Sequence, residues 1–155
     1  MKLQLKKIWL IFNIFFLLSS ICVYAMDIAQ WSYVTTDKLG NKMYIEPNNI
    51  NVILTGTKNS YELMANVAVV QPNGAGSLYK DLIYHDERYG NMISHHAIWS
   101  FKKYPPTSIN DFLTQAPIIL NTKNRIWYSA NGIDQWYSAE FNFVTKKAKE
   151  LHIKY

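Results

Sequence analysis

The sequence predicts an α+β fold, in which an antiparallel β-meander sheet carries one or two short packed helices. Apolar and polar residues alternate with a period of two along much of the chain, and the alternating runs are rich in β-branched and aromatic residues. This pattern is typical of half-buried strands. Turn-forming residues separate the runs at short intervals, with no long helical crossover between them, which favours antiparallel neighbours.

The clearest predicted strand is Ser60–Val70. Its alternate positions from Tyr61 to Val69 are apolar, whereas Glu62 and Asn66 lie on the other face, as in an antiparallel strand with one wet side. The other strands are expected at Gln30–Thr36, Lys42–Glu46, Ser77–His85, Met92–Phe101, Arg125–Ala130 and Asp134–Phe143.

Two short helices are expected. One follows Pro105 and Pro106, where Ser108 and Asp111 have the spacing of a capping box. The other spans Thr145–His152, which contains several good helix-forming residues. Both helices are short enough to pack on one sheet.

Residues 1–25 have the features of a cleaved secretion signal. Lys2 begins a positive region, Ile8–Leu18 is an apolar run interrupted only by Asn13, and Ala25 ends a small-residue cleavage motif. About 11 apolar residues are too few to span a bilayer, which takes roughly 20. We therefore expect a single α+β domain over residues 26–155, exported through the Sec pathway to the periplasm, the outer surface or the medium.

Charge and cysteine content exclude several classes of function. Three of the 16 basic residues lie in the leader, which leaves 13 against 11 acidic residues and no clustered basic face, so nucleic-acid binding is not expected. The only cysteine, Cys22, also lies in the leader, so we expect no disulfide, thiolate metal site or cysteine nucleophile in the exported domain. No further apolar run approaches the length of a transmembrane helix, and no cofactor is expected.

Asn131-Gly132 predicts a type I′ β-hairpin between two strands. Counting outward from this turn places Trp127 opposite Trp136, with Tyr128 and Tyr137 on the other face. Two interpretations stay open, because the tryptophans either brace the hairpin or anchor a partner. The four aromatic residues are the candidate binding residues.

The histidines His85, His95 and His96 are the basis of an alternative function, a small envelope hydrolase or a hydrolase inhibitor. His95 and His96 are adjacent, so on a regular strand they point to opposite faces and do not share a metal ion. The sequence contains no Gly-x-Ser-x-Gly motif. No catalytic residue and no metal ligand is therefore assigned.

Residues 30–115 resemble the bacterial surface-adhesin protein E-like family. The resemblance rests on a strand that begins at Trp31, a turn, the segment Met43–Pro47 and Ile50, followed by Tyr61–Val70, Ser77–Asp86 and Pro105–Ser108. The family often has a cysteine where this chain has Glu87, and Arg125 onward has no counterpart in it. The resemblance implies an antiparallel sheet with a helix and, in adhesin members, binding of host matrix or plasma proteins; it supplies no catalytic residues.

Taken together, these observations predict an exported, adhesin-like binding protein that engages a protein partner through an aromatic-rich sheet face. A surplus of tyrosine and tryptophan suits such recognition. Besides the hydrolase alternative, a structural envelope protein that forms a homodimer through a sheet edge stays open.

Overall fold

The computed structural model describes residues 30–55, 60–106, 109–114, 116–120, 125–132 and 135–154. The predicted leader at residues 1–25 lies outside the described residues. Among the helices of the described part, none has the length and apolar character needed to cross a membrane.

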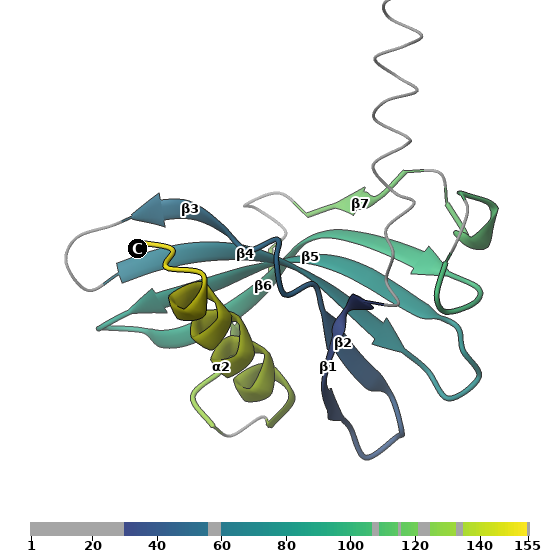
Figure 1. The fold of residues 1–155 in the computed structure, drawn as a ribbon, viewed down its shortest axis with the longest axis horizontal. Coiled ribbons are helices and arrows are strands. Elements are labelled where there is room, and N and C mark those ends of the chain that lie inside the picture. Colours follow the sequence, from purple (N-terminus) through teal and green to yellow (C-terminus); the bar gives the residue numbers. More distant parts are fainter. Residues whose placement is uncertain are drawn as a thin grey trace, which may run out of the picture.

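In the described part of the chain, eight strands form one antiparallel sheet in the order β1-β2-β4-β5-β6-β7 (Figure 1). β3 pairs with the same edge of β4 as β2 does, and β8 pairs with β6 beside β7. One C-terminal helix, α2 (Gln135–Glu150), packs on the sheet, so the predicted α+β meander is confirmed. The strands are β1 (Ser32–Thr36), β2 (Lys42–Ile45), β3 (Asn51–Thr55), β4 (Ser60–Val70), β5 (Gly76–Asp86), β6 (Gly90–Phe101), β7 (Ile118–Ile119) and β8 (Tyr128–Ser129).

The three long central strands agree with the sequence prediction to within two residues at each end. Local turn chemistry sets their ends. In the β4–β5 turn, the backbone N–H of Gly74 donates to the carbonyl of Gln71 at 2.9 Å, and Gly74 has a positive φ of 85°, which glycine adopts without strain. β3 and β7 were not predicted.

The two faces of the sheet carry separate hydrophobic cores. The face under α2, here called the covered face, includes Leu63, Ile83 and Ile93 together with Phe141 and Val144 of the helix. The opposite face, here called the far face, has its own cluster of Trp31, Ala68, Val70, Leu78, Ala97, Trp99, Phe101 and Phe112. Both faces of the sheet are therefore packed over part of their area.

The predicted strand Asp134–Phe143 is wrong, because Gln135–Glu150 forms the helix α2. Tyr137, Ala139, Phe141 and Phe143 do alternate, but the apolar residues continue at Val144 and Ala148, and Phe141, Val144 and Ala148 are buried. That spacing is the period of a helix face. The predicted tail helix over Thr145–His152 is thus the end of a longer helix.

The predicted Asn131-Gly132 hairpin is also wrong. Asn131 instead ties the connection to the start of β6, since its Oδ1 accepts a hydrogen bond from the backbone N–H of Asn91 at 2.9 Å. Gly132 then leads toward α2, where Ser138 Oγ accepts from the Gly132 N–H at 2.9 Å. Trp127 consequently does not face Trp136, and the predicted strand Arg125–Ala130 is reduced to Tyr128–Ser129.

The segment after the proline pair forms a short 3₁₀ turn, η2 (Ile109–Asp111), in place of the predicted helix. Ser108, the expected capping residue, lies outside the described residues. Phe112 follows the turn, bridges to Phe101 at the end of β6 and is buried in the far-face cluster. The segment therefore closes the far face of the sheet.

Candidate functional site

A cleft lies between α2, the β1–β2 turn and the covered face of the sheet. Figure 1 shows α2 lying across the sheet beside the β1–β2 hairpin. Two adjoining cavities, of about 660 Å³ and 390 Å³, share Asp37 and Trp136 as lining residues. We call the two cavities together the α2 cleft. The larger cavity is lined by Thr35, Thr36, Asp37, Lys38, Leu39, Gly132, Gln135 and Trp136.

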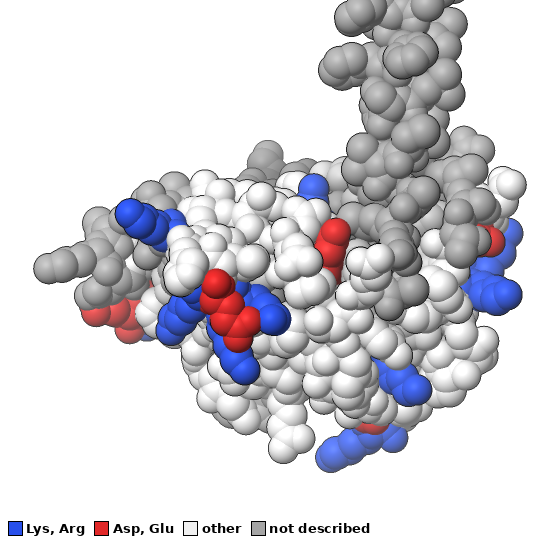
Figure 2. All heavy atoms as spheres, viewed as in Figure 1, with Lys and Arg blue, Asp and Glu red and all other residues white. Residues whose placement is uncertain are grey.

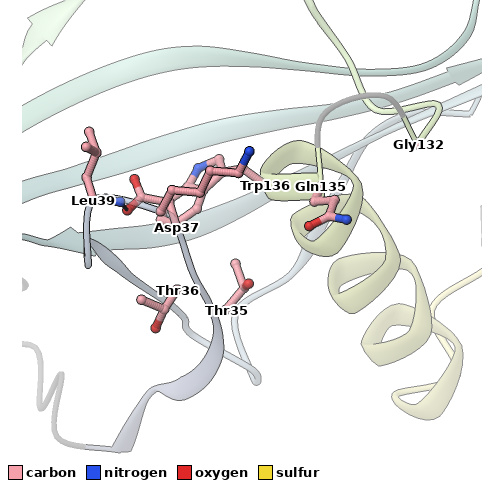
Figure 3. Close-up of a pocket in the computed structure, with 8 residues that line it drawn as sticks. Thr35, Thr36, Asp37, Leu39, Gly132, Gln135 and Trp136 are labelled. Carbon is pink, nitrogen blue, oxygen red and sulfur yellow. Dashed lines mark hydrogen bonds between the residues drawn. The ribbon is translucent and has the colours of Figure 1, made fainter.

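Trp136 lines both cavities of the α2 cleft. It lies in the first turn of α2, and Figure 3 shows its side chain extending from the helix toward Asp37. Trp136 also packs against the covered-face core. Its ring therefore lies where the two cavities adjoin.

Asp37 forms the rim of the α2 cleft. Slight burial opposes ionisation, but the Asn41 amide and the backbone N–H groups of Asn41 and Leu39 donate hydrogen bonds to its carboxylate at 2.8 to 2.9 Å. The hydrogen bonds outweigh the burial and lower the pKa of Asp37. Asp37 therefore shapes the β1–β2 turn as an ionised residue.

The floor of the smaller cavity holds three titratable side chains from three elements. Asp81 of β5 is 0% exposed, Glu140 of α2 is 1% exposed, and His95 of β6 is mostly buried. The His95 Nδ1 atom lies 2.6 Å from Asp81 Oδ1. Asp81 and His95 are cross-strand partners in the sheet register, and α2 brings Glu140 down on them.

A bulge in β6 places His95 in this position. Lys80 pairs with Ala97 whereas Asp81 pairs with His95, so His96 is the extra residue. A bulge changes which face the following residues occupy. It lets His95 face the α2 cleft while Ala97 joins the far-face cluster.

Burial dominates the electrostatics of the two carboxyl groups. It raises the pKa of Asp81 well above its usual value, although a hydrogen bond with Glu140 opposes the shift. Burial also raises the pKa of Glu140, and the negative charge of Asp81 and a hydrogen bond to Asp81 add to the effect. Two neighbouring buried carboxyls ionise together only at high cost, so the pair retains a shared proton at neutral pH.

His95 does not neutralise this pair. The short contact to Asp81 has the geometry of an ion pair, but burial lowers the pKa of His95 despite the nearby charge of Glu140. The imidazole is therefore neutral near pH 7, and its Nδ1 atom and Asp81 Oδ1 share one hydrogen. The negative charge of the floor has no positive partner at this contact.

Aromatic rings surround the floor. The Tyr79 ring lies 4.4 Å from the His95 ring, and Tyr128 stacks on Tyr137 with centroids 4.6 Å apart and an interplanar angle of 15°. Tyr128 also contacts His95, at 5.4 Å. Tyr79, Trp136 and Tyr137 line the smaller cavity beside the carboxyls.

The structure brings three of the four predicted aromatic residues to this site. Trp136 and Tyr137 line the α2 cleft, and Tyr128 stacks behind Tyr137. Trp127 is elsewhere: it is 39% exposed, with its ring 5.6 Å from Tyr84, which lies on the far face of the sheet.

Of the three predicted histidines, only His95 lies at the site. His85 pairs with Asn91 near the β5–β6 turn, and its Nδ1 is 2.7 Å from Asn91 Oδ1. The Nδ1 of His96 is 3.4 Å from the Arg125 guanidinium. The described residues contain no group of three or more His, Cys, Asp or Glu side chains arranged to hold a metal ion.

Sequence reasoning missed Asp81 and Glu140. Asp81 carried a usable signal, because it is an acidic residue in phase with Tyr79 and Ile83 on the inward face of a predicted strand. Glu140 lies in phase with Trp136 and Val144, but only when Gln135–Glu150 is interpreted as a helix. Because the sequence predicted a strand in place of this helix, Glu140 was not recognised as a partner of Asp81.

The acidic floor does not extend to the surface. Figure 2 shows charged side chains over α2 and around the margins of this face, with a largely uncharged surface between α2 and the β1–β2 hairpin. Comparison with known proteins found no matching family model, no similar curated protein and no similar solved structure. The residues and geometry of the α2 cleft are thus the basis for any functional proposal.

Proposed function

We propose that this chain is an exported binding protein that engages a protein partner through the α2 cleft. One observation carries the proposal: a cleft next to an otherwise uncharged surface is walled by Trp136 and Tyr137 and has buried polar groups at its floor. Clefts that combine aromatic walls with a few convergent polar groups are typical of binding sites. Rigid aromatic side chains are also the commonest anchors at protein interfaces.

The leader-like residues 1–25 and the resemblance to surface-adhesin protein E-like proteins support the choice of compartment and of partner. A protein exported to the cell surface meets host matrix and plasma proteins, which are the partners of the adhesin members of that family. These proteins are therefore the first partners to test.

The test measures binding of purified host matrix and plasma proteins to protein isolated after expression of the full chain. Trp136→Ala is expected to weaken binding by about tenfold or more, as for an interface anchor. Trp127→Ala is the matched control, because Trp127 contacts Tyr84 on the far face. Circular dichroism melting verifies that both variants fold. Absence of a saturable partner, or equal binding by wild type and Trp136→Ala, contradicts the proposal.

A second candidate function, an acid–base hydrolase, is favoured by the Asp81–Glu140 pair. A carboxyl kept protonated by burial beside a second carboxyl is able to act as general acid while its neighbour acts as base. Of the predicted hydrolase histidines, only His95 is placed to assist. A screen of chromogenic ester, glycoside and peptide substrates tests this function, and an activity that Glu140→Gln does not abolish excludes this site as its source.

A further inference from the structure

The larger cavity of the α2 cleft combines one aromatic ring with several hydrogen-bonding side chains. Its volume of about 660 Å³ is within the range of small-molecule sites. Thr35 and Thr36 line it from the end of β1 and Gln135 lines it from the first turn of α2, as Figure 3 shows. Among the described residues that line this cavity, none belongs to the buried acidic floor. It is therefore a site with a chemistry of its own.

The polar groups of the larger cavity both donate and accept hydrogen bonds. The Thr35 hydroxyl and the Gln135 amide each do both, and neither side chain is hydrogen-bonded to another residue in the described part of the chain. Asp37 is held in place by the turn, because its carboxylate already accepts three hydrogen bonds from Leu39 and Asn41. A carboxylate has about four acceptor positions, so Asp37 is a fixed acceptor with room for one more donor.

The charges of the larger cavity favour a neutral ligand. Asp37 and Lys38 are the only ionisable side chains among the described lining residues, and their formal charges cancel. An ion gains no net attraction from such a pair. A neutral molecule with several hydroxyl groups matches the lining better, because each hydroxyl both donates and accepts.

Trp136 supplies an apolar surface beside these polar groups. The side chain is half-buried, and it packs against the covered-face core while it lines the cavity. One face of a sugar ring carries C–H groups, which pack against the negative face of an aromatic ring. Because the indole is already anchored in the core, little conformational entropy is lost when a ligand binds to it.

We infer that the larger cavity binds a saccharide unit, with the sugar ring against Trp136 and its hydroxyl groups hydrogen-bonded to the polar side chains around it. A sugar is the class of ligand that joins an apolar C–H face to many neutral hydroxyls, as this lining requires. The inference rests on the proposed function for the carrier of the sugar, since secreted proteins commonly carry glycans on their surface. It assigns the chemistry by which the α2 cleft recognises its partner.

The first experiment titrates simple sugars into isotope-labelled protein, isolated after expression of the full chain. Glucose, galactose, mannose and N-acetylglucosamine are the probes. Glycerol, which has hydroxyls but no apolar face, and cyclohexanol, which has an apolar ring with one hydroxyl, are the controls. At least one sugar is expected to shift the indole N–H resonance of Trp136 saturably and to leave Trp127 unmoved. No saturable shift with any sugar, or equal binding of either control, overturns the inference.

Two variants of similar shape test the hydrogen bonds. Gln135→Met removes the amide and Thr35→Val removes the hydroxyl, and each is expected to weaken binding of the sugar about threefold to tenfold, the effect of one neutral hydrogen bond. Gln71→Met is the matched control, because Gln71 is exposed in the β4–β5 turn and lines neither cavity. Melting curves verify that the variants fold, and either Gln135→Met or Thr35→Val alone is sufficient for the test. Unchanged affinity in both overturns the inference.

Removal of glycans identifies the source of the saccharide. Host matrix and plasma proteins are tested for binding before and after enzymatic deglycosylation. Loss of the Trp136-dependent binding assigns the sugar to the partner. If the sugar probes bind and deglycosylation has no effect on the partner, the saccharide site stands and its ligand is a free sugar or a polysaccharide.

The two levels of proposal fail in different ways. If partner binding depends on Trp136 but no sugar probe binds, the proposed function stands and the saccharide site is wrong. If Trp136→Ala leaves partner binding unchanged, the proposed function is wrong, and the titrations with sugar probes decide the saccharide site separately.

Discussion

The two faces of the sheet bury their polar groups in different ways. On the far face, the buried hydroxyl of Ser94 donates to the carbonyl oxygen of Ile126 at 2.7 Å and is satisfied. On the covered face, α2 closes over Asp81 and Glu140, whose buried carboxyl groups hydrogen-bond to each other. Since burial opposes the ionisation of two neighbouring carboxyls, the covered face gives up stability at its cleft as the pH rises, whereas the Ser94 hydroxyl carries no such cost.

The largest expected effect tests whether the two hydrophobic clusters contribute equally. Phe101 is buried on the far face and Phe141 on the covered face. Truncation to Ala at either position is expected to lower the free energy of unfolding by about 3–5 kcal/mol, since each leaves a cavity in a packed core. Urea denaturation at pH 7 measures both. A loss below about 1 kcal/mol for Phe101→Ala would show that the far face is surface and not core.

The next effect concerns the pH dependence of stability. Folding raises the pKa of Asp81 and Glu140, so the folded state binds more protons than the unfolded state above about pH 4. Their contribution to stability is complete below the unfolded pKa and is lost as the pH rises toward the folded pKa, with a slope of at most about 1.4 kcal/mol per pH unit per proton. Glu140→Gln is expected to reduce this loss and to increase stability at pH 7.

His95 acts in the opposite direction. Because burial lowers its pKa, its contribution is present at neutral pH and is lost as the pH falls below the unfolded value, about 6.5. Thermal or urea denaturation of wild type and Glu140→Gln from pH 4.5 to pH 8 separates the two contributions. A wild-type protein that gains stability from pH 5 to pH 7 as steeply as Glu140→Gln would show that the carboxyl pair is not perturbed.

The smallest expected effect is on the far face. Burial, with a lesser contribution from Tyr44, raises the pKa of Tyr104 to about 12, and the two rings stack with centroids 5.0 Å apart. Tyr104→Phe retains the ring and is expected to change the free energy of unfolding by less than about 0.5 kcal/mol, as is usual for a mild substitution. NMR titration of ring-labelled tyrosine is expected to lose its latest-ionising phenol in this variant. If that phenol remains, the late-ionising tyrosine lies elsewhere.

The central strands could be predicted from local patterns. The alternation in Ser60–Val70 and the turns on either side of β5 specified three strands within two residues of their observed ends. In these segments the period of two, the turn residues and the tertiary packing all favour the same strands. Such strands can therefore be predicted from the sequence.

The structure of the C-terminal third could not be predicted from local patterns in the same way. Asn131-Gly132 is a strong hairpin signal, and seven residues from Tyr137 to Phe143 fit a strand as well as a helix. Residues farther along the chain distinguish the helix from the strand, since Val144 and Ala148 complete an apolar face only in a helix. Asn131 does not form the predicted hairpin turn, because its side chain accepts a hydrogen bond from the backbone N–H of Asn91, 40 residues away.

The sequence by itself determined the antiparallel sheet, its central strands and the aromatic surplus, because each follows from residues that are neighbours in the chain. Only the tertiary structure decided where the polar site lies. Asp81 and His95 meet through sheet register, and Glu140 joins them because α2 packs across that register. Contacts between residues 14 to 59 positions apart depend on packing of the whole domain, which no local pattern encodes.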